Sequence, residues 1–264
     1  MYRGNYNLSS DMVDALKKAT VNEINPLGVK ILDSLKDNLL IAGNDSVPIC
    51  QDTGMAVVFI EVGQEVHLVG GSIEAAINEG VRRGYTNGYL RKSVVKDPLE
   101  RENTKDITPA VIHYTIIEGE NINITVAPKG FGSENMSRVF MLKPADGYEG
   151  IKNAVITAVK DAGPNACPPM VVGVGVGGTF EKAAELAKRS LLRPVGSVSE
   201  NAWAAKMEKE LLEEVNKTGI GPGGLGGSTT AFAVNISTYP THIAGLPVAV
   251  NICCHVNRHA SATL

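Results

Sequence analysis

The stretch Ala162–Gly178, AGPNACPPMVVGVGVGG, decides the fold, because it joins a cysteine-bearing loop to an apolar strand interrupted by glycines. The loop is rich in proline and carries Cys167, and the apolar run follows it directly. The run is short, and the segment after it, Phe180–Leu191, has helical periodicity. The sequence therefore predicts a strand that leads into a helix, with a cysteine at the strand's entrance.

The glycines of this run form a GxGxxG pattern at residues 173, 175 and 178, the spacing of dinucleotide-binding turns. The next segment, RPVGSVSENAW, leads into another helix and not into a second strand that ends in an acidic residue. A second match at residues 219, 221 and 224 follows a helix, which is the wrong context. We therefore interpret the glycines as places of tight strand-to-helix packing.

The flanking segments predict an α+β (mixed α/β) fold, in which a helical N-terminal part is followed by mixed sheets with flanking helices. Ser9 or Ser10 is expected to cap a first helix, and Pro26 suits the first turn of a second. The other expected helices cover residues 72–83, 149–161, 180–191 and 200–216, and the expected strands cover 55–62, 110–117, 122–127, 230–236 and 247–253. We expect one domain over residues 1–264, with a helical subregion within 1–45.

Composition and charge exclude several classes of protein. Formal net charge is −3, from 25 basic and 28 acidic residues, which gives no electrostatic footprint for nucleic acid or an anionic membrane. No apolar run approaches the 18 residues of a membrane span. The first residues, MYRGNYNLSSDMVDALKK, lack an apolar signal core, so we expect a cytoplasmic protein that binds neither nucleic acid nor membrane.

Three of the four cysteines are candidates for metal binding, and two of them, Cys50 and Cys167, lie in loops rich in proline and polar residues. Cys50 lies in PICQDTG, Cys167 in PNACPP and Cys254 in ICCHVNRH, and no CxxC pair is present. A cysteine among prolines and polar residues suits a deprotonated ligand better than a buried structural role. Three thiolates would leave one iron of a cubane cluster open, and an open iron can act as a Lewis acid on a hydroxyl leaving group. On these residues alone, a shared metal or cluster site remains one hypothesis beside ordinary thiols.

Six blocks, in order along the chain, resemble the class I (iron–sulfur) fumarate hydratase family, which includes L-tartrate dehydratase. The resemblance covers most of the chain, roughly from residue 30 to the end, and the order of the blocks makes it specific. They are PICQDTG (48–54), LRKSVVKDPL (90–99), KGFGSENMS (129–137), ACPPMVVGVGVGG (166–178), GPGGLGG (221–227) and THIAGLPVAVNICCHVNRHA (241–260).

The resemblance implies a [4Fe–4S] cluster and a set of substrate contacts. The family's cluster ligands match Cys50, Cys167 and Cys254. Cys253 could replace Cys254 only if its strand slipped by one residue, which would turn the side chain to the other face. The family's substrate contacts match residues that include two expected participants in proton transfer, Asp52 and His242. These contacts are Gln51, Asp52, Arg91, Gly130, Gly132 and His242.

Plainer interpretations remain open for several of these residues. Asp52 in a QDTG turn can simply close an Asx-turn, His242 can be structural, and Arg91 can form a surface ion pair. Beyond Cys254, residues 255, 258 and 259 (His, Arg and His) either tune the cluster or are solvated. A non-catalytic zinc module would need His255 or Cys253 as a fourth ligand.

The resemblance also implies a partner and a reaction. Single-chain members of the family continue into a further domain, so this chain looks like the α subunit of the two-subunit form, which needs a β subunit and forms higher oligomers. The expected reaction is the reversible hydration of fumarate to L-malate, and the alternative is dehydration of L-tartrate to oxaloacetate. L-Malate and L-tartrate are both small dicarboxylates, and they differ by one hydroxyl.

Overall fold

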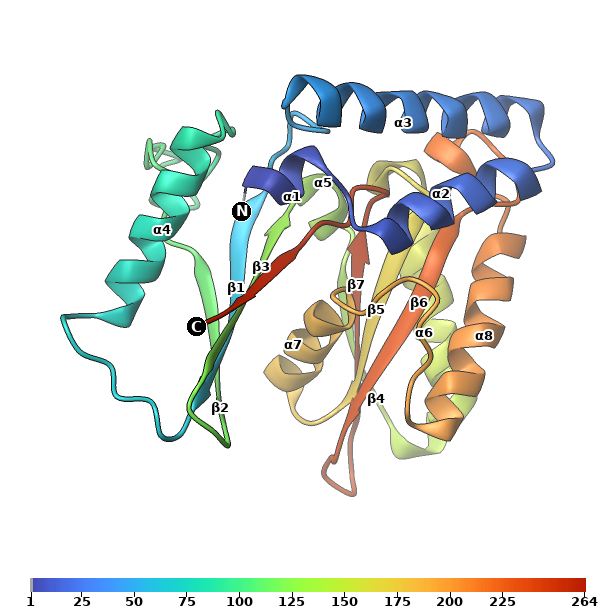
Figure 1. Cartoon of the computed structure of the whole chain (residues 1–264). Helices are drawn as coiled ribbons and strands as arrows, with labels where there is room; N and C mark the ends of the chain where they lie inside the picture. The colour runs from blue at the N-terminus through green and yellow to red at the C-terminus, as the bar shows by residue number, and fades with distance from the viewer. Residues whose placement is uncertain (1) are drawn as a thin grey trace. The chain divides into compact units, whose positions relative to one another are not determined.

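The computed structural model describes residues 2–264 and divides the chain into two compact units (Figure 1). Unit 1 comprises residues 2–9, 39–131 and 258–264, and unit 2 comprises residues 10–38 and 132–257. The first 45 residues are therefore shared between the units. The expected α+β class is confirmed, because helices accompany two mixed four-stranded sheets.

The helices and strands of Figure 1 follow the chain in this order. The helices are α1 (Tyr2–Tyr6), α2 (Ser10–Asn22), α3 (Pro26–Asp45), α4 (Ile73–Asn87), α5 (Phe131–Glu134), α6 (Gly147–Ala162), α7 (Phe180–Ser190) and α8 (Ala202–Lys217). The strands are β1 (Met55–Gly63), β2 (Val111–Ile117), β3 (Ile122–Lys129), β4 (Arg138–Leu142), β5 (Met170–Gly177), β6 (Ala231–Tyr239), β7 (Leu246–Cys253) and β8 (Ala260–Thr263). Within residues 2–264, no helix combines the length and apolar character needed to cross a bilayer.

The sheet of unit 1 has the strand order β2-β1-β3-β8. β1 pairs with β2 in parallel and with β3 in antiparallel register. The consecutive strands β2 and β3 are thus not neighbours, although the turn Glu118–Asn121 joins them directly. β1 takes the inner position because nearly all its residues are buried, which suits a strand covered on both faces.

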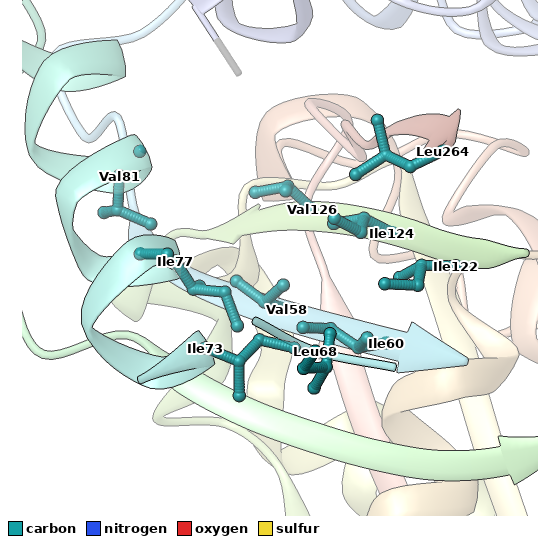
Figure 2. Close-up of a pocket in the computed structure, with 12 residues that line it drawn as sticks. Val58, Ile60, Leu68, Ile73, Ile77, Val81, Ile122, Ile124, Val126 and Leu264 are labelled. Carbon is teal, nitrogen blue, oxygen red and sulfur yellow. The ribbon is translucent and has the colours of Figure 1, made fainter. Parts of the chain in front are cut away.

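Helix α4 covers one face of this sheet and leaves an apolar pocket beside it. Ser72 caps the helix by accepting a hydrogen bond from Ala75 N (3.3 Å). Figure 2 shows the side chains of Ile73 and Ile77 on the side of α4 that faces Val58 and Ile60 of β1. The pocket has a volume of about 380 Å³, and its lining is almost wholly apolar.

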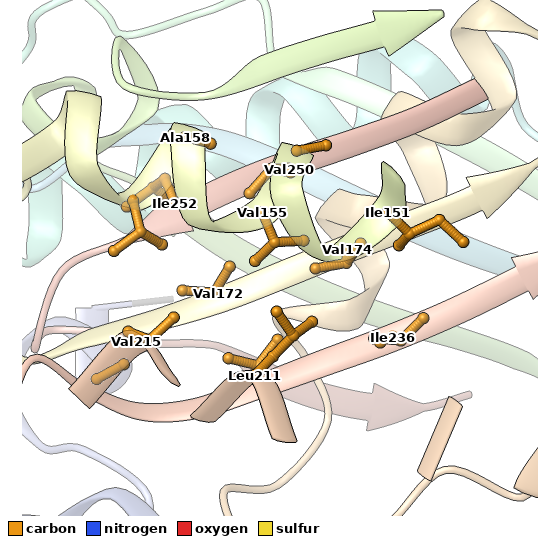
Figure 3. Packing of buried hydrophobic residues seen from close by; sticks show 14 of the residues in the cluster. Ile151, Val155, Ala158, Val172, Val174, Leu211, Val215, Ile236, Val250 and Ile252 are labelled. Carbon is orange, nitrogen blue, oxygen red and sulfur yellow. The ribbon is translucent and has the colours of Figure 1, made fainter. Parts of the chain in front are cut away.

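The sheet of unit 2 has the order β4-β7-β5-β6, and helices cover both of its faces. β5 is its most buried strand and pairs in parallel with β6 and antiparallel with β7. Figure 3 shows Val155 of α6 and Leu211 of α8 packed with Val172 and Val174 of β5 in one core. Because strand side chains alternate, Gly173 and its neighbours at every second position face α7 on the other side.

The glycines of β5 bring α7 into backbone contact with the strand. A Cβ on Gly173 would lie 2.1 Å from Ala187 O, and one on Gly175 would lie 2.1 Å from Ala183 O. No side chain fits in that space. The interpretation of this GxGxxG run as tight strand-to-helix packing is confirmed.

We expect Gly175→Ala to destabilise the protein by about 1–3 kcal/mol, because the added methyl must push α7 off the sheet. Urea unfolding of the cluster-free chain measures this change. Gly80→Ala in α4 is the matched control, because a Cβ there meets no atom within 4 Å. Helix propensity predicts that this control gains about 0.5–1 kcal/mol. Equal stability of the Gly175→Ala variant and wild type would contradict the close-packing argument.

Candidate functional site

The turn Cys50–Gly54 in unit 1 is fixed by a side chain that bridges it to the segment of Arg91. Thr53 Oγ1 accepts a hydrogen bond from Arg91 N (2.9 Å) and donates to Arg91 O (3.3 Å). Thr53 is 1% exposed, so water does not compete for these bonds. The PICQDTG and LRKS blocks, far apart in sequence, therefore lie together in this unit.

The carboxylate of Asp52 joins the same turn to the end of β3. Its Oδ1 accepts a hydrogen bond from Gly54 N (3.0 Å), which is the Asx-turn considered from sequence. Its Oδ2 accepts one from Phe131 N (2.8 Å). A Cβ on Gly130 would lie 3.1 Å from Oδ2, so the absence of a side chain there lets the carboxylate approach the backbone. Asp52 thus has a structural contact through each oxygen.

Two buried side chains support the turn from beneath, and only one of them, Arg258, lies in a motif block. Tyr85 of α4 donates its hydroxyl to Gly54 O (2.6 Å) and is fully buried. Burial raises the pKa of Tyr85, so the phenol stays protonated as a donor. Arg258 donates from Nη2 to Asp52 O (2.5 Å) and is only 5% exposed, so it is not the solvated residue considered from sequence.

The side chains that the turn presents outward are those expected to meet substrate or iron. Arg91 and Gln51 are exposed, and Cys50 is half-buried with its Sγ 3.3 Å from Gln51 Oε1. Within the described residues, the Arg91 guanidinium has no ion-pair partner, so the surface ion pair considered from sequence is absent there. A planar guanidinium in this state can bind a carboxylate through two hydrogen bonds.

In unit 2, the loops of Cys167 and Cys254 meet through His255. The carbonyl oxygen of Cys167 lies 3.4 Å from the backbone N of His255, which donates to it, and 3.0 Å from the ring Nδ1. Cys167 itself is exposed and adopts a left-handed conformation (φ 51°, ψ 63°) at the entrance to β5. Because His255 follows Cys254 directly, the two cysteines lie at one end of the unit 2 sheet.

The adjacent thiols Cys253 and Cys254 differ in their environment. Cys253 ends β7, pairs with Val171 and is 5% exposed, whereas Cys254 lies just beyond the strand and is half-buried. A hydrogen bond with Cys253 and burial raise the pKa of the Cys254 thiol when no metal is bound. Iron coordination deprotonates a thiol outright, so this direction describes only the cluster-free chain.

The structure places Gly132 beside the Cys167 loop and His242 at the other end of the sheet. A Cβ on Gly132 would lie 3.8 Å from the carbonyl oxygen of Asn165. His242 is exposed in the turn between β6 and β7, where Thr241 donates to Gly178 O (2.9 Å) at the exit of β5. The eight residues of β7 span roughly 25 Å, so His242 is not brought together with Cys254 within one chain.

The chemistry of the donor set fits an iron–sulfur cluster. No disulfide joins any of the four cysteines within the described residues, and the three expected ligands are more exposed than Cys253. Soft thiolate ligands select iron–sulfur clusters and zinc over hard cations. Within residues 2–264, no three His, Cys, Asp or Glu side chains are arranged around a single ion. A cluster spreads its ligands over several irons, so single-ion geometry is not what its site requires.

Comparison with known proteins adds a family and close relatives. The sequence profile described as fumarate hydratase (Fumerase) matches residues 1–263. A protein of Methanocaldococcus jannaschii, provisionally named L(+)-tartrate dehydratase subunit alpha, is 42% identical over 96% of this chain and 90% of its own length. The L(+)-tartrate dehydratase subunit alpha of Escherichia coli is 33% identical over 96% of this chain and 84% of its own length, and that of Shigella sonnei matches to the same extent.

Proposed function

This chain belongs to the fumarate hydratase (Fumerase) family as a homologue of its α subunits, and we propose that it is part of an iron–sulfur hydro-lyase that interconverts fumarate and L-malate. One observation carries the proposal. A single turn in unit 1 presents Cys50, Gln51 and Asp52, and it is hydrogen-bonded to the segment of Arg91. A thiol, a carboxylate and a guanidinium are the groups that metal-assisted dehydration of a hydroxy acid needs.

We assign the cluster ligands to Cys50, Cys167 and Cys254. When bound, a [4Fe–4S] cluster with one open iron supplies a Lewis acid for the hydroxyl leaving group. Cys253 is excluded from the set because its side chain is buried at the end of β7. Cysteines outside disulfides are the usual state in a reducing cytoplasm, which supports a cytoplasmic location.

The other residues of the turn, together with Arg91, bind substrate and transfer its proton. Arg91 is exposed and unpaired within the described residues, and it grips one substrate carboxylate. Gln51 donates an amide hydrogen bond to the substrate. Asp52 moves the proton or orients the group that does, and its contact with Phe131 N holds Oδ2 in place.

His242 reaches substrate only from another molecule under this proposal. It lies at the end of the unit 2 sheet opposite to Cys167 and Cys254. The proposed higher oligomer would supply it from a second copy of the chain. The names of the relatives, as α subunits, support a β subunit as a further partner that completes the active site.

L-Tartrate dehydration is the second candidate, and the names of the relatives favour it. Malate and tartrate differ by one hydroxyl, and a site that hydrogen-bonds a hydroxyl can discriminate strongly against a substrate without it. The turn in unit 1 offers no group that would bind only the additional hydroxyl of tartrate. The choice therefore depends on turnover measurements.

We expect the chain to be active only after anaerobic reconstitution and assembly with its β subunit. The assembled enzyme should convert L-malate to fumarate faster than it converts L-tartrate to oxaloacetate, and the chain alone should turn over neither. Iron and sulfide analysis of the same sample tests the cofactor. Faster tartrate turnover would establish the second candidate, and one zinc without iron or sulfide would favour a non-catalytic module. Full activity of the chain alone would refute the need for a partner.

A further inference from the structure

Glu23 is a buried carboxylate directly after α2 that no sequence motif predicts. It is 7% exposed. Its Oε1 accepts hydrogen bonds from the backbone N–H groups of Ile24 (3.0 Å), Asn25 (2.9 Å) and Ser228 (2.8 Å), and its Oε2 accepts one from Thr229 (2.9 Å). Burial raises the pKa of Glu23, but the N–H donors of Asn25 and Ser228 outweigh it and lower the pKa below its usual value. The group is therefore an anion at neutral pH.

Glu23 contacts the C-terminal end of the glycine-rich loop, which we define as residues 219–227. All six glycines of this loop have positive φ, a region that glycine enters without steric cost. Such a segment gains little rigidity from its own side chains, so its folded shape depends on its neighbours. A Cβ on Gly227 would lie 2.7 Å from Glu23 Oε1, and Ser228 follows as a donor to the same oxygen. The carboxylate thus fixes this end of the loop.

The other side of the loop contacts the residues on either side of Cys167. Gly223 donates its N–H to Pro168 O (2.9 Å). A Cβ on Gly224 would lie 2.3 Å from Pro164 Cβ, so loop and proline are in close contact. Pro164 O in turn accepts the hydrogen bond of Cys167 N (3.0 Å). All of these residues belong to unit 2.

We propose that Glu23 is a positioning residue for Cys167, acting through the glycine-rich loop. The carboxylate fixes the conformation of the loop, and the loop holds Pro164 and Pro168 in place on either side of Cys167. Cys167 needs such support because it has a left-handed backbone and an exposed side chain. The inference rests on the proposed function, since it assumes that Cys167 is a cluster ligand. Groups that orient metal ligands in this way commonly change metal affinity by about 10–100-fold when removed.

Glu208 provides a matched control for a purely structural role. It is likewise buried in unit 2 at 6% exposure. It accepts hydrogen bonds from Arg193 Nη1 (2.5 Å), Ile236 N (2.7 Å) and Ser199 N (3.0 Å). None of these donors belongs to the glycine-rich loop. Loss of either carboxylate should lower the stability of the fold, but only Glu23 should affect the cluster.

The test compares wild type, Glu23→Gln and Glu208→Gln as full chains after anaerobic reconstitution with iron and sulfide. In Glu23→Gln, the amide places an N–H donor against the backbone donors of Ser228 and Thr229. We expect its cluster absorbance to bleach about tenfold faster with an iron chelator than that of wild type. Glu208→Gln should bleach at the wild-type rate although the thermal midpoint of its cluster-free chain also falls.

Equal bleaching rates for the two variants at comparable thermal midpoints would overturn the inference. A wild-type chain that holds no iron and sulfide would instead overturn the proposed function, so the two failures are distinguishable. If Glu23→Gln does not fold, Glu23→Asp replaces it, since aspartate keeps the charge and shortens its reach by one methylene. Faster bleaching of that variant than wild type supports the inference, and an unchanged rate refutes it.

Discussion

Cys167→Ser is expected to abolish cluster binding and with it all hydro-lyase activity of the assembled enzyme. Serine matches cysteine in size, and the backbone hydrogen bonds of residue 167 to Pro164 and His255 do not involve the side-chain sulfur. The fold should therefore survive. The hydroxyl is a much weaker ligand for iron than a thiolate, because iron–sulfur clusters select soft sulfur ligands. Iron and sulfide per chain should fall to the level of a chelator-treated sample.

Cys253→Ser is the control, because it makes the same chemical change next to a proposed ligand. The Cys253 side chain is buried at the end of β7. A serine hydroxyl there lowers the free energy of unfolding by about 1–3 kcal/mol if it finds no hydrogen-bond partner. Its cluster spectrum should match that of wild type. A cluster that persists in Cys167→Ser and is lost in Cys253→Ser would show that the ligand assignment is wrong.

The sequence predicts the elements of this fold better than it predicts their neighbours. Strong periodicity is sufficient for α3, which begins at the expected Pro26, and for the entry of β5 into α7. The sequence does not predict the short elements α1, β4 and β8, because four or five residues are too few to show a clear hydrophobic periodicity. The position of β1 between β2 and β3 is non-local, so the turn at Glu118–Asn121 gives no sign of it.

For the candidate site, too, the sequence predicts some residues and not others. The motif blocks predict the residues that present functional groups, such as Asp52 and Arg91, and the structure brings these two segments together within unit 1. The sequence does not predict Tyr85 and Glu23 as supporting residues, and it offers Arg258 only as a group that tunes the cluster or is solvated. They act on backbone N–H and carbonyl groups of distant segments, and backbone partners leave no pattern in a sequence.

Asp52→Asn is expected to lower kcat of the assembled enzyme by about 10²–10⁴-fold, the usual contribution of a proton-transfer group. Asparagine keeps one carbonyl oxygen, so it can still accept the hydrogen bond of Gly54 N that closes the Asx-turn. It loses the negative charge and the ability to accept a proton. The amide must also give up either the contact with Gly54 or that with Phe131.

This substitution separates the two interpretations of Asp52, because asparagine can still close the Asx-turn with Gly54 at the cost of the contact with Phe131, but it cannot take up a proton. If Asp52 transfers the proton, kcat falls while iron, sulfide and the cluster spectrum stay at wild-type values. If Asp52 only shapes the turn, the variant retains activity to within a few-fold, and proton transfer must be assigned to the β subunit. Loss of the cluster together with activity would point to a third role, in which the carboxylate holds Cys50 in place through the turn. Thr53→Val, which removes the bridge to Arg91 but keeps Asp52, tests that role, because it should then also release iron.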